Sequence, residues 1–133
     1  MDDPRNIAPE GWHVPSDAEL KQLEMYLGMS QAEADYEGMR GTDEGGKLKE
    51  VGIIHWNPPN TGAVNESGFT ALPGGYRFTL GGFYNMGYNA LFWSSTEYSS
   101  SRVWFRILYH DSSQISRDYT HKPYGFSVRC VKD

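Results

Sequence analysis

The sequence feature that most constrains the fold is the final third of the chain, residues 87–133, which holds three short runs of aromatic and β-branched residues. The runs cover 87–97, 103–109 and 125–132, and Ser, Asp and Asn residues lie between them. Runs of this length and composition, bounded by turn-forming residues, are typical of consecutive antiparallel strands. The final third therefore predicts a small antiparallel sheet.

The middle run raises the functional question, because both of its faces are largely apolar. Side chains alternate along a strand, so Trp104, Arg106 and Leu108 share one face. The other face is apolar throughout and consists of Val103, Phe105, Ile107 and Tyr109. Such a strand is either buried on both faces, or buried on one face and used for recognition on the other.

The closing run alternates in the same way, so Phe126, Val128 and Cys130 are predicted to face the core. Cys130 is the only cysteine, which excludes an intramolecular disulfide and predicts a small buried hydrophobe. We interpret the tryptophans as core or core-edge residues: Trp12, Trp56, Trp93 and Trp104.

Helices are predicted before the strands. Ser16 and Glu19 form a capping-box pattern that predicts a helix over 17–27, and a second box at Ser30 predicts another helix to about Met39. Residues 41–71 are rich in Gly, Asn, Pro and Thr and indicate a long ordered loop, with one helical turn at 47–50. A short hairpin is expected at 78–84, around two glycines. The whole chain, 1–133, thus predicts a single α+β domain with two short N-terminal helices, a loop-rich middle and a small antiparallel sheet.

Composition excludes several classes of function. The chain has 133 residues and a net charge of −5, which argues against a nucleic-acid surface. Its apolar runs are shorter than the roughly 20 residues that span a bilayer, so we expect no membrane span in this chain. We also expect that any export signal lies outside it.

Motifs for catalysis and cofactors are weak. Residues 41–48 have the spacing of a phosphate-binding loop, but Leu48 replaces the hydroxyl residue and two carboxylates lie within the loop. The 4 histidines lack metal-ligand spacing, and Cys130 has no evident base partner. We therefore predict no catalytic residues, no metal and no cofactor.

The tract from Tyr109 to Tyr124 is rich in Tyr, Ser, His and Asp, the composition of many recognition surfaces. It is also the composition of an ordinary solvated hairpin loop, and the apolar face of the neighbouring run favours recognition. The predicted exposed, ligand-binding residues are Phe105, Ile107, Tyr109, His110, Asp111, Ser116, Asp118, Tyr119, Thr120, His121, Pro123 and Tyr124.

Ordered blocks along the chain resemble the Fibrobacter succinogenes major paralogous domain family. The blocks are 11–19, 46–49, 67–77, 92–97 and 125–133. The resemblance implies a C-type-lectin-like fold, related to that of formylglycine-generating enzymes, and display on the surface of gut Bacteroidetes. It implies no catalytic residues. The family also carries a first strand that pairs with the last, whereas only ten residues precede Gly11 here.

The resemblance also directs the choice of function. The calcium signatures of lectins and the paired cysteines of formylglycine-generating enzymes are absent from the sequence. Some proteins of this fold are targets of diversity-generating retroelements, whose mutagenised codons cannot encode Lys, Glu, Gln, Met or Trp. None of the predicted binding residues is of these types, whereas Trp104, Gln114 and Lys122 are.

We therefore expect a non-catalytic, extracellular or cell-surface binding domain of a bacterium or phage. Its C-terminal surface, which the retroelement hypothesis makes hypervariable, would contact a protein or other macromolecular ligand. The alternatives are a glycan-binding module that uses exposed aromatic residues and, with less support, an enzyme related to the formylglycine-generating group.

Overall fold

A computed structural model describes residues 7–133 of the chain. Its elements are β1 (Trp12–His13), α1 (Asp17–Tyr26), α2 (Gln31–Asp35), β2 (Gly38–Arg40), α3 (Glu44–Leu48), β3 (Tyr76–Arg77), β4 (Phe83–Tyr84), β5 (Asn89–Ser99), β6 (Arg102–Tyr109), β7 (Ile115–His121) and β8 (Val131–Lys132). The helices come early in the chain and the long strands come late, which confirms the predicted α+β class.

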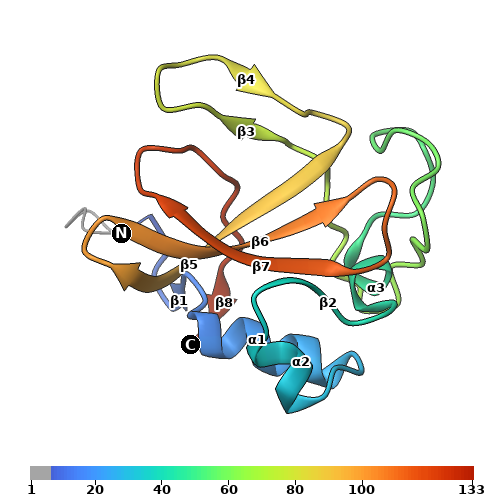
Figure 1. Ribbon diagram of the computed structural model, residues 1–133, viewed down its shortest axis with the longest axis horizontal. Coiled ribbons are helices and arrows are strands. Elements are labelled where there is room, and N and C mark those ends of the chain that lie inside the picture. The colour runs from blue at the N-terminus through green and yellow to red at the C-terminus, as the bar shows by residue number, and fades with distance from the viewer. Residues whose placement is uncertain (1–6) are drawn as a thin grey trace.

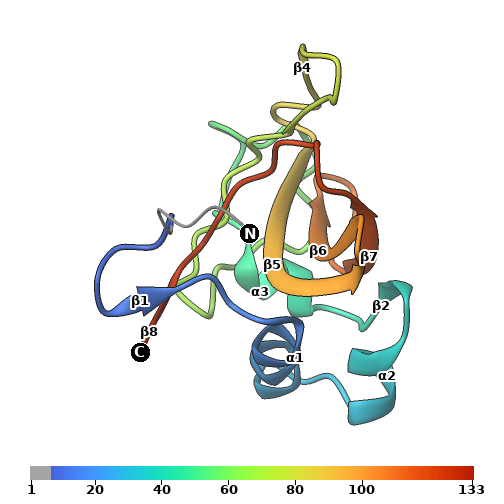
Figure 2. The ribbon, with the colours of Figure 1, turned by 90° about the vertical axis from the view of Figure 1, so that its left-hand side faces the viewer.

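The centre of the molecule is a four-stranded antiparallel sheet in the order β2-β7-β6-β5 (Figure 1). Helices α1 and α2 lie on one side of this sheet, and the β3–β4 hairpin lies on the other (Figures 1 and 2). We call these the helix side and the hairpin side. Because β6 is an inner strand between two layers, both of its faces have neighbours.

The structure confirms the first predicted helix, and the second helix is shorter than predicted. Ser16 caps α1 by accepting from the amide of Glu19, whose carboxylate accepts from the amide of Ser16. The same box opens α2 at Ser30. The predicted end of this helix at Met39 is wrong, because Tyr36 is already extended and 38–40 pair as β2 with the edge of β7. A helix continued to Met39 would leave that edge of β7 unpaired.

Helix α3 begins before the predicted turn at 47–50. The carboxylate of Glu44 folds back and accepts from the amides of Thr42 (2.7 Å) and Asp43 (3.1 Å). This side chain satisfies the amide of the N-cap residue, Asp43, and the amide of the residue before it. A carboxylate of the Gly-rich segment 41–48, that of Glu44, therefore binds backbone amides of the same segment.

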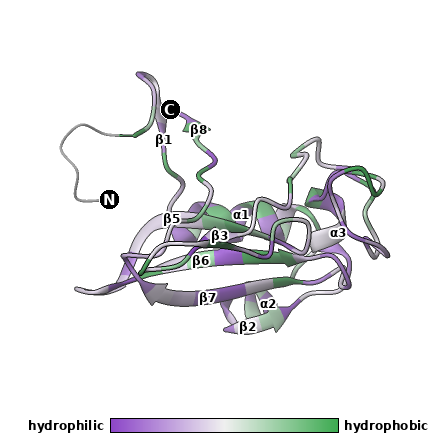
Figure 3. Ribbon diagram, turned by 90° about the horizontal axis from the view of Figure 1, so that it is seen from above, coloured by the Kyte–Doolittle hydropathy of each residue, from purple (hydrophilic) through white to green (hydrophobic). Residues whose placement is uncertain are grey.

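Strand β7 was not predicted. It runs through the tract that the sequence indicated as a loop, and it lies between β6, which pairs with its whole length, and β2, which pairs with residues 115–117. Figure 3 shows why the pattern concealed it: β6 is largely hydrophobic, whereas β7 is largely hydrophilic. Polar residues can line an inner strand only if their partners are supplied by other parts of the fold.

The closing run and the hairpin also differ from prediction. Only Val131–Lys132 form a strand, while 125–128 run beside β5, with Ser127 donating to Leu91 O (3.0 Å) and accepting from Trp93 N (3.1 Å). In the hairpin, 76–77 pair with 83–84, so the predicted strand at 78–80 is the loop. Cys130 is only partly buried, contrary to the prediction of a buried hydrophobe.

The core is divided by the sheet. One cluster on the helix side gathers around Trp56, Ala71, Leu108 and Ile115. The other cluster, on the hairpin side, contains Leu91, Trp93, Val103 and Phe105. The predicted burial is confirmed for Trp56, Trp93 and Trp104, but Trp12 is 43% exposed.

The two ends of the described chain meet in the antiparallel pair β1-β8, with Trp12 opposite Lys132. His13 strengthens this pair: Nε2 lies 2.8 Å from Glu19 Oε1, and Nδ1 lies 2.7 Å from Asp133 Oδ1. The hydrogen bonds to Asp133 and Glu19 raise the pKa of His13. One imidazole therefore links β1 to both α1 and the C-terminal residue.

This link makes part of the stability depend on pH. Because the pKa of His13 is raised in the folded state, its protonation favours folding fully below the ordinary value of 6.5, and that contribution is lost as pH rises through the raised pKa. We expect the difference in melting temperature between wild type and His13→Gln to be largest in mild acid and to shrink above that pKa. Thermal melts between about pH 5 and about pH 9 measure it. A difference that is constant with pH would contradict the prediction.

Candidate functional site: the open face of the sheet

Strand alternation divides the predicted ligand-binding residues between the two sides of the sheet. Ile107 lies opposite Ser116, and Phe105 lies opposite Asp118. Paired residues of antiparallel strands point to the same side. The hairpin side therefore carries Phe105, Ile107, Tyr109, Ser116, Asp118 and Thr120. Tyr119 and His121 pair with Trp104 and Arg102 and belong to the helix side.

Buried ion pairs join the helix side of the sheet to helix α1. Arg106 Nη1 lies 2.8 Å from Asp17 Oδ1, and Arg106 Nε lies 2.9 Å from Glu24 Oε1. Arg117 Nη2 lies 2.8 Å from Asp17 Oδ2, and Arg40 pairs with the other oxygen of Glu24. All five side chains are buried. The network therefore connects α1 to β2, β6 and β7 through side chains that point to the helix side of the sheet.

Charge in this network is balanced unevenly, since three arginines face two carboxylates. Burial raises the pKa of Asp17, but hydrogen bonds from Arg117 and Arg106 outweigh it and bring the pKa below its ordinary value. Burial lowers the pKa of Arg40 to about 10, although Glu24 opposes this shift. The arginines depend on these two carboxylates for their counter-charge.

Tyr119, predicted as a ligand contact, lies in an aromatic stack on the helix side. Its ring lies parallel to that of Tyr98 at 3.7 Å, and both rings are nearly perpendicular to the ring of Trp104 at centroid distances of 5.3 Å. The guanidinium of Arg117 covers Trp104 at 3.7 Å from the ring centroid. Tyr98 is 45% exposed and Tyr119 is partly exposed, so the stack presents aromatic surface to solvent.

On the hairpin side, the predicted exposure of Phe105 and Ser116 is wrong. Phe105 is 6% exposed and packs against Phe126 at 4.8 Å and Trp93 at 5.9 Å. Ser116 is 2% exposed, and its hydroxyl lies 3.3 Å from Asp118 Oδ2. The segment 124–128 covers Phe105, because it runs along the edge of β5 and packs Tyr124, Phe126 and Val128 against the cluster that contains Phe105.

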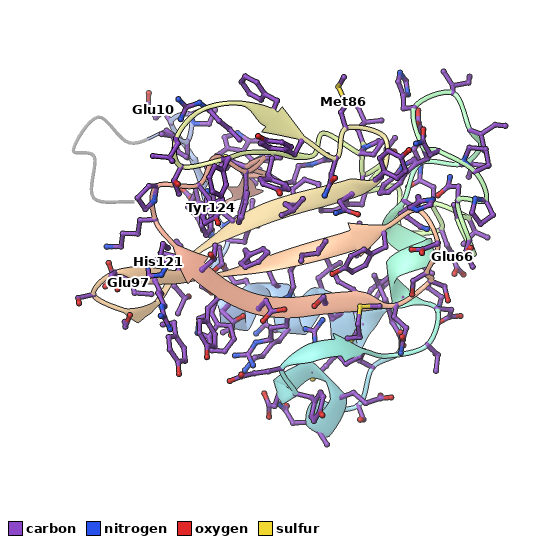
Figure 4. The ribbon with its side chains drawn as sticks, turned by 45° about the horizontal axis from the view of Figure 1, so that its top comes forward. Glu10, Glu66, Met86, Glu97, His121 and Tyr124 are labelled. Atoms are coloured by element: carbon purple, nitrogen blue, oxygen red, sulfur yellow. The ribbon has the colours of Figure 1, made fainter. Side chains whose placement is uncertain are left out.

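Tyr124 is half-buried between the hairpin and the sheet (Figure 4). Its ring lies 5.6 Å from Phe78, 5.9 Å from Phe126 and 6.1 Å from Tyr76. It therefore forms the border between the covered part of the hairpin side and the uncovered part.

The uncovered part of the hairpin side holds five partly exposed side chains, which we call the open face: Ile107, Tyr109, Asp118, Thr120 and Tyr124. Burial raises the pKa of Tyr109, and its hydrogen bond with Ser116 opposes the shift. This face combines an aliphatic side chain, two phenols, a carboxylate and a hydroxyl. Such a surface can bind a partner through apolar contact and hydrogen bonds.

The remaining predicted residues lie at opposite ends of the sheet. His110 and Asp111 occupy the turn after β6, where His110 Nδ1 lies 3.0 Å from Pro58 O and its ring meets Tyr88. His121 and Pro123 lie at the far end of β7, and His121 is on the same end as Glu97 in Figure 4. At about 3.3 Å per residue, β7 separates these two groups by roughly 20 Å. They cannot all contact one small ligand.

Within residues 7–133, no three His, Cys, Asp or Glu side chains are placed to hold a metal ion. A Cβ atom on Gly45 or Gly46 of the Gly-rich segment would collide with the main chain of Gln114 or Gly62. These glycines therefore allow close backbone packing. None of the described helices is long and apolar enough to cross a membrane.

A pocket of about 610 Å³ lies on the helix side, between α1 and the β1-β8 pair. Its wall is mostly apolar and includes Leu23, Phe69 and Phe92. Two charged residues of the wall, Glu24 and Arg106, are already paired with each other. The pocket can therefore bury apolar groups, and neither Glu24 nor Arg106 is free to exchange a proton with a ligand there.

Comparison with known proteins identifies the family. No match is found among curated proteins or among solved structures. The model of the Fibrobacter succinogenes major domain matches residues 1–132, nearly the whole chain. This match agrees with the blocks recognised in the sequence, and the chain therefore belongs to the Fibrobacter succinogenes major domain family.

Proposed function

We propose that this domain is a non-catalytic binding module, displayed outside the cell, that contacts a macromolecular ligand through its open face. The observation that carries the proposal is an asymmetry of the sheet. Its helix side is held by buried ion pairs, whereas part of its hairpin side leaves five side chains of mixed chemistry partly exposed. Rigid backbone beneath adaptable side chains is the usual basis of a recognition surface.

The backbone under the open face is fixed independently of the exposed side chains. Every residue from Arg102 to Leu108 pairs with β7, and 38–40 pair with its other edge. Asp118 and Thr120 can therefore change without loss of main-chain hydrogen bonds. Their substitution is expected to cost less than about 1 kcal/mol each, as for other surface positions.

The retroelement hypothesis draws support from the residues that it requires to stay constant. Trp104 is buried in the aromatic stack, Gln114 Nε2 donates to Gly41 O at 2.9 Å, and Lys122 pairs with Glu97. All three make contacts that hold the fold. The hypothesis, like the implied C-type-lectin-like fold, remains a prediction, and aligned sibling sequences test it: substitutions clustered at the open face would support it, and substitutions spread evenly along the chain would refute it.

Binding through the open face is testable with a small set of substitutions. We expect Ile107→Thr, Asp118→Asn and Thr120→Ala, combined in one variant, to weaken binding about tenfold or more while the domain stays folded. The measurement is binding of wild type and variant to arrays of bacterial surface proteins and of glycans.

A matched control carries the same number of changes at exposed positions elsewhere: Val64→Thr, Glu66→Gln and Ser100→Ala. It should bind as wild type does. Equal loss in both variants, or unchanged binding in the open-face variant, would contradict the proposal.

Glycan binding is the second candidate, and the exposed ring of Tyr98 favours it. This ring is 45% exposed at the end of the stack with Tyr119, and sugar rings pack on such aromatic faces. If this surface is the site, Tyr98→Ala will abolish the glycan signals on the array and leave the protein signals unchanged. The open-face variant would then have the opposite effect.

A further inference from the structure

Lys49 is a fully buried lysine at the junction of three chain segments. Its Nζ lies 2.8 Å from Thr61 O, 2.8 Å from Tyr109 O and 3.0 Å from Ser112 O, and its side chain is 0% exposed. An ammonium group has three N–H donors and no acceptor. The three carbonyls therefore use its entire donor capacity.

The charge of Lys49 is held without a hydrogen-bonded carboxylate in the described part of the chain. Burial lowers its pKa to about 8, and the attraction of Asp111 opposes this shift only from a distance. The ring of Trp56 adds a weaker contact, with its centroid 5.3 Å from Nζ. The carbonyl dipoles are thus the main groups that stabilise a cation at this point.

We propose that the carbonyls of Thr61, Tyr109 and Ser112 form a monovalent-cation site that the Lys49 ammonium occupies permanently, and that Lys49 thereby positions the turn from Tyr109 to Ser112. Convergent main-chain carbonyls bind monovalent cations by replacing their hydration shell. The observed spacing of 2.8–3.0 Å exceeds the roughly 2.0–2.6 Å at which magnesium and calcium bind oxygen. A large monovalent ion such as potassium, or an alkylammonium ion, is the class of ligand that fits.

Positioning of this turn matters for the open face. Tyr109 belongs to that face, and the next residue, His110, accepts a hydrogen bond from Thr61 N (2.9 Å) at its carbonyl oxygen. The hydrogen bonds of Lys49 to Thr61 O and Tyr109 O join the same two segments. The consequence for ligand binding rests on the proposed function, whereas the cation site does not.

Chemical rescue tests the cation site. Lys49→Ala removes the ammonium and leaves a space in front of the three carbonyls, and we expect its melting temperature to fall by about 5–10 °C in tetramethylammonium chloride. Methylammonium or potassium chloride at the same ionic strength should restore at least about half of the loss, with saturation. The wild type should show no such response. If the variant does not fold in tetramethylammonium chloride, the yield of refolded protein in each salt is the readout.

Two control variants make the test specific. Lys49→Met fills the space with an apolar chain and should resist rescue. Lys47→Ala removes a neighbouring lysine whose Nζ donates to Leu27 O (2.7 Å), and it should not respond to the cations either. Absence of rescue in Lys49→Ala, or equal rescue in the Met variant, would overturn the cation site.

Array binding of the rescued Lys49→Ala protein separates this proposal from the proposed function. Recovery of the melting temperature together with recovery of binding supports the positioning role. Recovery of the melting temperature without binding would refute positioning of the open face and leave the cation site. Unchanged binding in the open-face variant described above would refute the proposed function alone.

Discussion

Asp17→Asn is expected to lower the free energy of unfolding by about 3–5 kcal/mol, the usual cost of removing one partner from a buried ion pair. Asp17 accepts from Arg106 Nη1 at 2.8 Å and from Arg117 Nη2 at 2.8 Å. The asparagine keeps the shape of the side chain but leaves both guanidinium groups without this counter-charge. Because a domain of this size has about 5–15 kcal/mol of stability, the loss would be a large fraction of the total.

Urea unfolding measures this effect, and Asp35→Asn is the matched control. Asp35 pairs with Lys21 at 2.9 Å, but its side chain is 50% exposed, so solvent screens the pair and its loss should cost far less than the loss of Asp17. Equal costs for the two substitutions would show that the buried network does not connect α1 to the sheet as described.

The Asp17 effect also has a predicted pH dependence. Its pKa in the folded protein is below the ordinary value of 3.8, so its contribution is fully present above that value and is lost as pH falls through the lowered pKa. The difference between wild type and Asp17→Asn should therefore shrink in strong acid. The same unfolding curves, repeated in acid, measure the change.

Phe105→Ala is expected to cost about 3–5 kcal/mol, because it opens a cavity among large aromatic side chains. Phe105 lies 4.8 Å from Phe126 and 5.9 Å from Trp93, measured between ring centroids. The substitution should release the segment 124–128 from β5, and Tyr124 with it. We therefore expect loss of stability first and loss of binding only as its consequence.

Thr120→Ala is the control for Phe105→Ala, since Thr120 is on the same side of the sheet but is partly exposed. Its effect should stay within about 0.5 kcal/mol. Thermal melts and urea curves of both variants give the comparison. A change in Phe105→Ala as small as that in Thr120→Ala would mean that the residue is accessible, as the sequence predicted, and that the hairpin side is not covered at that point.

Local signals made several elements predictable. The two capping boxes marked the starts of α1 and α2, since each side chain bonds an amide three residues away. The apolar runs marked β5 and β6, because short runs rich in aromatic and β-branched residues are typical of strands. Family blocks supported the same reading. Interactions between residues that are close in sequence can be recognised from the order of the residue types alone.

Strand β7 was not predictable, because its stability comes from distant partners. Arg117 on this strand is buried only because Asp17, which is 100 residues away, supplies its counter-charge. Without that partner, a run of Ser, Arg, Asp and Thr is typical of a loop. The same error put Tyr119 beside Asp118 on one surface, although alternation along a strand separates them.

The sequence by itself determined the α+β class, the helix starts, the two apolar strands and the family. Only the tertiary structure decided which apolar face is covered, where α2 ends and which predicted residues share a surface. The physical reason is that burial depends on what lies opposite a side chain. Segment 124–128 covers Phe105 and leaves Ile107 partly open, and no property of either residue distinguishes them before the chain is folded.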